Sequence, residues 1–240
     1  MLRVRIIGPG RAGRSLGQAL AAAGWTPAGE LRRSDAVGDA ARGVDLLVIA
    51  TPDASIGEVA TAVEPVAATV VAHLSGSLGL EVLAPHARRA GIHPLVALPD
   101  PDIGARLLRA GAWFAVAGDP LARTVVAALG GHTLEVADHD RPAYHAAACI
   151  ASNHLVALLG QVERVAALAG VPLDAYLDLV RATVDNVAAL GPAAALTGPV
   201  ARGDLETVAH HLAAIPEDER PAYEAMAALA GRLVPAEARS

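Results

Sequence analysis

An apolar run that ends directly in a glycine-rich turn restricts the fold of this chain more than any other feature. The run Leu2–Ile7 has the composition of a buried strand, and Gly8-Pro9-Gly10-Arg11-Ala12-Gly13 follows it without a gap. An alanine-rich helical stretch, Arg14–Ala23, comes next. In such a turn the first glycine makes the bend, the second lets a phosphate approach the backbone, and the third allows close helix–strand packing. The segment therefore predicts a strand–turn–helix unit that binds a dinucleotide at its helix N-terminus. A glycine turn without a ligand is the alternative.

Apolar runs alternate with helical stretches through the first part of the chain. The predicted strands are Leu2–Ile7, Trp25–Leu31, Val44–Ala50, Thr69–Leu74, Leu95–Leu98, Ala112–Ala117 and Thr133–Val136. This alternation is typical of parallel βαβ units, and the continuous apolar runs fit a sheet with helices on both faces. We expect an α/β, doubly wound Rossmann domain over residues 1–138.

The pattern changes to helices alone near Asp138. The predicted helices cover about 140–169, 173–190, 205–214 and 217–234, and Asp204 is placed to cap the third. An all-helical C-terminal domain over residues 139–240 is therefore expected.

Composition excludes several classes of protein. The net charge of −6 argues against a nucleic-acid binder, and the apolar stretches are too short to cross a membrane. The single Cys149 excludes a disulfide framework, and no clustered His/Cys spacing predicts a metal site. The strand at the N-terminus leaves no room for a signal-peptide core, so a cytoplasmic protein is expected. All 19 basic residues are arginine, which excludes lysine chemistry; GC-rich codon usage explains this composition more simply than selection.

The end of the second predicted strand distinguishes NADP from NAD. Glu30 is a ribose ligand of the kind that NAD sites use, whereas Arg32, Arg33 and Ser34 offer charge-assisted donors to a 2′-phosphate. We favour NADP(H) over NAD(H), with a solvated basic turn as the alternative. A methyltransferase loop is disfavoured because Ile6 stands where such loops carry an acidic residue.

Polar residues follow other predicted strands. Ligands of open α/β sheets lie outside the carboxyl ends of the strands. We therefore expect Ala50, Thr51 and Pro52 to border the cofactor. The predicted sites on the substrate side are Ser75, Gly76 and His93. Ordinary turns, helix caps or a rigid strand entry are the alternatives.

Several segments together resemble a known family. These are GPGRAG, ATPD (50–53), HLSGS (73–77), GIHPL (91–95), YHAAACIASNHLVAL (144–158) and ALTGPVARGD (195–204). They resemble Rossmann-like proteins with a DUF2520 C-terminal domain, a branch of the 6-phosphogluconate dehydrogenase-like superfamily that includes pyrroline-5-carboxylate and ketopantoate reductases. The resemblance covers nearly the whole chain and implies an NADP-linked oxidoreductase that pairs as a homodimer through its helices.

The resemblance also implies a substrate-binding helix. Related β-hydroxyacid dehydrogenases place a catalytic lysine four residues before an asparagine; here Asn153 matches the asparagine, but Cys149 replaces the lysine. On an α-helix His145, Cys149 and Ser152 lie within about 60° of one another, with Asn153 about 80° from His145. We therefore predict His145 as the acid/base, with Asn153, Ser152 and Ser75 holding the substrate. Polar residues satisfied inside a helical core are the alternative.

Two hypotheses of function remain open. The first is an NADP-dependent reductase or dehydrogenase of a small anionic carbonyl compound, with Arg202 as an anion ligand; the resemblance to the superfamily implies a 2-oxo acid. The second is a non-catalytic dinucleotide-binding protein whose helices form an interaction surface. The missing lysine favours the second hypothesis, and Ser75 with Asn153 favours the first.

Overall fold

The computed structural model describes residues 1–235 and contains two compact units, which divide after Ser152. The first unit is an α/β fold and the second is helical, which confirms the predicted fold class. The strands end at Glu135, close to the boundary predicted at residue 138, whereas the compact units divide farther along the chain. Each unit is described by itself.

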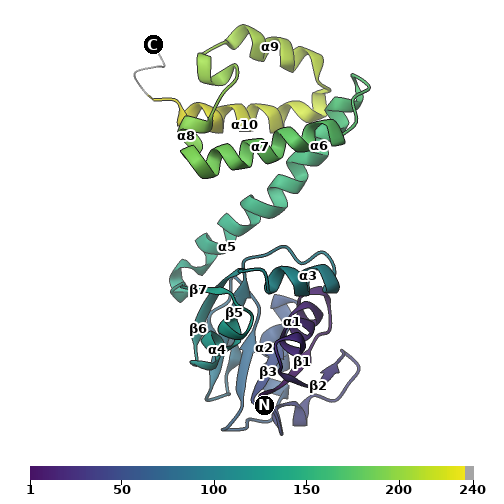
Figure 1. The fold of residues 1–240 in the computed structure, drawn as a ribbon, viewed down its shortest axis with the longest axis vertical. Helices are drawn as coiled ribbons and strands as arrows, with labels where there is room; N and C mark the ends of the chain where they lie inside the picture. The colour runs from purple at the N-terminus through teal and green to yellow at the C-terminus, as the bar shows by residue number, and fades with distance from the viewer. Residues whose placement is uncertain (236–240) are drawn as a thin grey trace. The chain divides into compact units, whose positions relative to one another are not determined.

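The first unit is built on one seven-stranded sheet (Figure 1). Its strands are β1 (Arg3–Ile7), β2 (Thr26–Leu31), β3 (Leu46–Ile49), β4 (Val70–His73), β5 (Arg89–Pro94), β6 (Trp113–Gly118) and β7 (His132–Glu135). Their order is β2-β1-β3-β4-β5-β6-β7, and all neighbouring pairs are parallel except β5 with β6. The carboxyl ends of β1 to β5 therefore share one edge of the sheet.

Helices cover both faces of this sheet. The helices are α1 (Arg11–Ala22), α2 (Asp53–Ala62), α3 (Pro101–Leu108), α4 (Leu121–Ala128) and α5 (Arg141–Cys149), with short 3₁₀ turns η1 (Gly38–Ala41), η2 (Leu80–Leu83) and η3 (Asp138–Asp140). One core joins the sheet to α1, α3 and α4, and a second joins it to η1, α2 and η2. Alternate residues of each strand enter the two cores, as in β3, where Leu46 and Val48 face one and Leu47 and Ile49 the other.

The fifth strand is where the sequence prediction of strands is wrong. The structure places it at Arg89–Pro94 instead of 95–98. On one face this strand carries Ala90 and Ile92, but on the other it carries Gly91 and His93. A strand with polar or glycine residues on one face lacks the apolar run expected of a doubly covered sheet.

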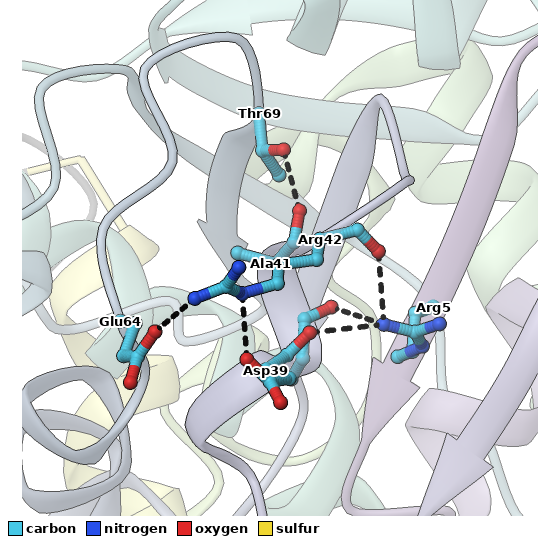
Figure 2. A network of polar contacts seen from close by, with 7 residues as sticks. Arg5, Asp39, Ala41, Arg42, Glu64 and Thr69 are labelled. Atoms are coloured by element: carbon cyan, nitrogen blue, oxygen red, sulfur yellow. Dashed lines mark hydrogen bonds and ion pairs between the residues drawn. The ribbon is translucent and has the colours of Figure 1, made fainter.

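A polar network ties η1 to the sheet (Figure 2). Arg5 of β1 donates from Nη1 to the carbonyl oxygen of Ala40 at 2.6 Å, and Thr69 donates from Oγ1 to the carbonyl of Ala41 at 2.7 Å. Arg42 pairs with Glu64 at 2.6 Å. These bonds satisfy carbonyl groups of the irregular segment and fix the connection between β2 and β3.

The second unit consists of helices. After a π-helical segment, η4 (Ile150–His154), come α6 (Leu155–Ala167), α7 (Asp174–Leu190), α8 (Pro192–Ala195), η5 (Val200–Arg202), α9 (Leu205–Ala214), η6 (Glu217–Glu219) and α10 (Arg220–Leu233). Asp204 accepts a hydrogen bond from the Thr207 amide at 3.0 Å, so the predicted cap of α9 is confirmed. Among residues 153–235 the buried hydrophobic residues are Ala166 and Ile215. No helix within residues 1–235 is both long enough and apolar enough to cross a bilayer.

Candidate functional site

The three glycines of the turn after β1 have three different surroundings. Gly8 has a φ of +88°, and a Cβ there would meet backbone atoms of Ala50 and Thr51 at 2.9 Å. A Cβ on Gly13 would lie 2.5 Å from the Gly8 carbonyl oxygen. A Cβ on Gly10, in contrast, would have no atom within 4 Å. Gly8 and Gly13 are therefore required by packing, whereas Gly10 keeps the space in front of the helix open.

The N-terminus of α1 faces this open space without a capping side chain. Gly10 is its N-cap residue, and no side chain caps the helix. The first-turn residues Arg11 and Ala12 thus have backbone N–H groups that a ligand can satisfy. Pro9 lies in the turn, and the Arg11 side chain is exposed. This arrangement suits a pyrophosphate.

The end of β2 lies beside the glycine turn. The Gly8 amide donates to the carbonyl oxygen of Leu31 at 2.9 Å. Glu30 forms an ion pair with Arg14 of α1 at 3.5 Å, so the predicted ribose ligand already has a cationic partner. Arg32 and Arg33 are exposed, and within residues 1–235 their guanidinium groups have no hydrogen-bonded or ionic partner. Ser34 is also exposed and donates weakly to Asp35 at 3.4 Å. Two guanidinium groups thus remain available to a phosphate.

The loop after β3 adds a polar atom beside the turn. The Ala50 amide donates to the carbonyl oxygen of Ile7 at 2.8 Å, and Pro52 is the residue before α2. Between them, the buried Thr51 hydroxyl has no hydrogen-bond partner among the described residues. A buried hydroxyl without a partner is costly, so Thr51 is a candidate ligand for a bound molecule.

Ser75 and Asp53 form the centre of a hydrogen-bond network at the end of β4. Ser75 Oγ donates to Asp53 Oδ2 at 2.6 Å, and Ser77 Oγ donates to the same oxygen at 3.0 Å. Ser75 Oγ also accepts from the amides of Ser77 and Leu78 at 3.2 and 3.1 Å. The hydroxyl of Ser75 is therefore fully engaged and orders the loop; to donate to a substrate it would have to release Asp53.

Three ring side chains gather next to this loop. His93 Nδ1 lies 2.7 Å from the hydroxyl of Tyr144, and the ring of His145 packs edge-on against His93 with centroids 5.7 Å apart. A Cβ on Gly76 would lie 2.5 Å from His145 Nδ1 and 2.9 Å from His93 Nε2. Gly76 therefore allows both imidazoles to approach the loop of Ser75. The structure brings together four of the predicted site residues: Ser75, Gly76, His93 and His145.

The protonation of this cluster follows from its burial and charges. Burial, the neighbouring His145 and Arg141 together lower the pKa of His93 to about 4. Burial raises the pKa of the Tyr144 hydroxyl. His93 is therefore neutral near pH 7. The Nδ1 atom of His145 is buried without a partner among the described residues.

The remaining predicted residues lie beyond the regular part of α5. Cys149 Sγ is 3.7 Å from His145 Nε2, so these two residues share a face as expected. The π-helical segment then begins, and its wider turn ends the regular 100° rotation before Ser152 is reached. Asn153 and Arg202 belong to the second unit and are exposed there. Their roles stay predictions. No group of three metal-ligating side chains gathers anywhere in residues 1–235.

Five residues of this cluster were not predicted as site residues: Asp53, His73, Ser77, Arg141 and Tyr144. Asp53 and Ser77 stand in the motifs ATPD and SGS, where they resemble helix-cap or turn residues. Tyr144 is one residue from His145, and consecutive side chains on an α-helix point about 100° apart, yet both rings contact His93. Arg141 carries no sequence signal beyond its position at the start of a helix.

Two family models match the chain. That of a Rossmann-like domain matches residues 32–99, and that of DUF2520, a domain of unknown function, matches residues 114–230. These are the two domains that the motifs resemble, so the matches confirm that resemblance. No curated protein is similar enough to count as a relative.

Solved structures share the fold over nearly the whole chain. A proposed NADP oxidoreductase from Bacteroides fragilis is 16% identical, with a TM-score of 0.78 over 96% of this chain and 98% of the other. Protein TM1727 from Thermotoga maritima is 23% identical, with a TM-score of 0.73 over 98% and 99%. A reductive aminase from Aspergillus terreus, solved with NADPH and ethyl levulinate, is 18% identical, with a TM-score of 0.71 over 97% and 93%. At these identities the similarity is one of fold.

Proposed function

We propose that this protein is an NADP(H)-dependent oxidoreductase that transfers hydride to or from a small anionic carbonyl compound, such as a 2-oxo acid. The observation that carries the proposal is the contrast within the glycine turn. Gly8 and Gly13 are fixed by packing, and Gly10 opens onto an uncapped helix N-terminus. Such a site suits the pyrophosphate of a dinucleotide.

The residues around the turn fit the rest of NADP(H). The guanidinium groups of Arg32 and Arg33 have no partner among the described residues and would hold the 2′-phosphate, while Ser34 adds a hydroxyl. The Thr51 hydroxyl, which has no partner among the described residues, would donate a hydrogen bond to the cofactor. The fold shared with a reductive aminase that was solved with NADPH supports this choice of cofactor. When bound, NADPH supplies the hydride.

The cluster at the ends of β4 and β5 would supply the proton. Reduction of a carbonyl group leaves an oxygen that needs a proton, and the chain contains no lysine. His145 is the proton donor in this proposal, because its imidazole packs against His93 and lies beside Gly76 in the loop of Ser75. Tyr144 fixes His93 through its 2.7 Å hydrogen bond, and His93 in turn packs against His145.

The predicted substrate ligands complete the proposal. Gly76 leaves room at the imidazoles, and Ser75 would bind a substrate oxygen if it released Asp53. We retain Asn153, Ser152 and Arg202 as substrate ligands on the basis of the sequence motifs alone.

The test combines binding with turnover. NADPH is titrated calorimetrically into the protein and into Gly10→Asp, which places a negative charge where the pyrophosphate would lie; 2-oxo acids and imines are then screened by loss of NADPH absorbance. We expect binding that Gly10→Asp abolishes, and turnover of at least one substrate class. Native affinity in Gly10→Asp would refute the cofactor site.

A non-catalytic dinucleotide-binding protein is the second candidate. Two observations favour it: the chain has no lysine, and the Ser75 hydroxyl already donates its hydrogen bond to Asp53. NADPH binding without turnover of any 2-oxo acid or imine would support this second function.

A further inference from the structure

Arg141 is a buried cation with most of its donors unused. Its side chain is 0% exposed, and its Nε donates to Asp138 Oδ1 at 3.1 Å. Its two terminal nitrogens, Nη1 and Nη2, have no hydrogen-bond partner within the described residues. Burial of an ionised group is costly unless its donors are satisfied. The sequence retains a charge here that the fold alone does not satisfy.

His73 places a second unused donor beside this guanidinium. It is the last residue of β4 and is also 0% exposed. Its Nδ1 accepts from the Ser75 amide at 3.2 Å, so the proton of the neutral ring lies on Nε2. Burial and the nearby Arg141 lower the pKa of His73, which keeps the ring neutral. The Nε2 atom has no partner in the described part of the chain.

Gly91 brings these two donors to one point. It pairs with His73 in neighbouring strands. A Cβ on Gly91 would lie 3.2 Å from Arg141 Nη2 and 3.7 Å from His73 Nε2. Both atoms are donors and neither can accept, so they cannot satisfy each other. Only an acceptor, and preferably an anionic one, satisfies both.

The position of this pair connects it to the candidate active site. His93 lies two residues beyond Gly91 on the same face of β5, and it is only partly buried. The donors of Arg141 and His73 meet at Gly91, which is therefore the neighbour of His93 on this face of β5, toward the amino end of the strand. Arg141 also acts electrostatically on His93, which places its charge near the ring.

We propose that Arg141 and His73 bind a carboxylate of the substrate over Gly91, so that the substrate class is a small carboxylic acid with a reducible carbonyl or imine group. That the bound carboxylate belongs to a substrate rests on the proposed function, but the anion site itself does not. A guanidinium binds a carboxylate through charge-assisted hydrogen bonds, and the imidazole N–H adds a further donor.

The test measures anion binding without chemistry. Oxamate, a carboxylate whose amide resists reduction, is titrated calorimetrically into the protein with and without saturating NADPH. Two variants probe the site: Arg141→Met removes the charge, and Gly91→Ala places a methyl group between the donors while both remain. Gly38→Ala is the matched control, because a Cβ there has no atom within 4 Å.

We expect one oxamate per chain, with affinity reduced about 10- to 100-fold in Arg141→Met and in Gly91→Ala, and unchanged in Gly38→Ala. Thermal unfolding checks that each variant folds. If Arg141→Met does not fold, Gly91→Ala still tests the site. The Cε1 proton resonance of His73 should shift with oxamate. Unchanged affinity in Gly91→Ala, or no oxamate binding at all, would overturn the inference. Oxamate binding in a protein that fails to bind NADPH would refute the proposed function and leave the anion site standing.

Discussion

The hydroxyl of Tyr144 lies 2.7 Å from Nδ1 of His93, and this bond joins the first turns of α5 to the end of β5. Tyr144 and His145 are consecutive residues, yet both rings contact His93 edge-on, with centroids 5.5 and 5.7 Å away. His93 therefore lies between two neighbours that could hold a proton. Burial, His145 and Arg141 keep His93 neutral near pH 7, and both neighbouring rings pack against it.

The first prediction separates the roles of these rings. His145→Ala should lower turnover by about 10²- to 10⁴-fold, the usual loss for a general acid, with NADPH affinity unchanged. Tyr144→Phe removes the hydrogen bond to His93 but leaves the imidazoles, so its loss should be smaller. Steady-state kinetics and NADPH titration of both variants provide the measurement. A larger loss of turnover in Tyr144→Phe than in His145→Ala would identify Tyr144, and not His145, as the proton donor.

The second prediction concerns acid stability. The pKa of His93 falls from its ordinary value of 6.5 to about 4 on folding, so the unfolded chain binds more protons between these pH values. The contribution to stability is therefore complete above pH 6.5 and is lost as the pH falls toward 4, in total about 3 kcal/mol. His73, whose pKa is also lowered, acts in the same direction. Urea unfolding between pH 7 and about 4 should show a weaker pH dependence in His93→Asn than in the parent. The exposed His154 gives the control His154→Asn, for which the slope should stay as in the parent.

The third prediction uses the contrast between two glycines of the turn. Gly13→Ala forces a Cβ to within 2.5 Å of the Gly8 carbonyl oxygen and should lower the free energy of unfolding by about 1–3 kcal/mol. Gly10→Ala has an ordinary backbone conformation and open space, so the fold should be unaffected while NADPH binding weakens. Chemical denaturation and calorimetry measure the two effects. Equal effects of both variants on stability would contradict the assignment.

Much of the fold was predictable because it follows local rules. The glycine turn, the alternation of strands and helices and the cap at Asp204 depend on neighbouring residues and on period. The strand Arg89–Pro94 was not predicted because it lacks such a local pattern. Its residues Gly91 and His93 face the polar cluster, so that face of the strand is not apolar.

The candidate site was predictable only in part. Ser75, His93 and His145 are residue types with known chemistry, and they stand in motifs. Asp53 and Arg141 acquire their meaning only from tertiary contacts: the bond from Ser75 and the convergence of unpaired donors over Gly91. Such contacts join positions far apart in the chain, which no pattern in a single sequence reveals.

The fourth prediction is a preference for NADPH over NADH. The guanidinium groups of Arg32 and Arg33 have no partner in the part of the chain that the structure describes, whereas the Glu30 carboxylate is already paired with Arg14. A charge-assisted hydrogen bond contributes about 1.5–3 kcal/mol, so replacing both arginines with alanine should remove most of the preference. Arg106→Ala with Arg109→Ala removes equal charge from the exposed end of α3 and serves as the control. Equal affinity of the parent for both cofactors would contradict this preference and favour Glu30 as a ligand of the ribose.

The last prediction is that the protein forms a homodimer through its helical unit. In residues 153–235 the buried hydrophobic residues are Ala166 and Ile215, too few to stabilise a unit of this size alone. On α7, Leu179, Val187 and Leu190 are 63%, 38% and 61% exposed and lie within about 80° on one face. An exposed apolar face of this kind is usually covered by a partner, and we propose that a second copy of the chain covers it.

Light scattering should give twice the chain mass of 24.3 kDa. Leu179→Glu with Leu190→Glu should convert the dimer to a monomer of lower melting temperature, because charges are costly in an apolar interface. Ile103→Glu is the control, since Ile103 is an exposed apolar residue of α3 in the first unit, and the dimer should persist there. A parent protein that is monomeric at micromolar concentration would rule the dimer out, and the apolar face of α7 would then need a different partner.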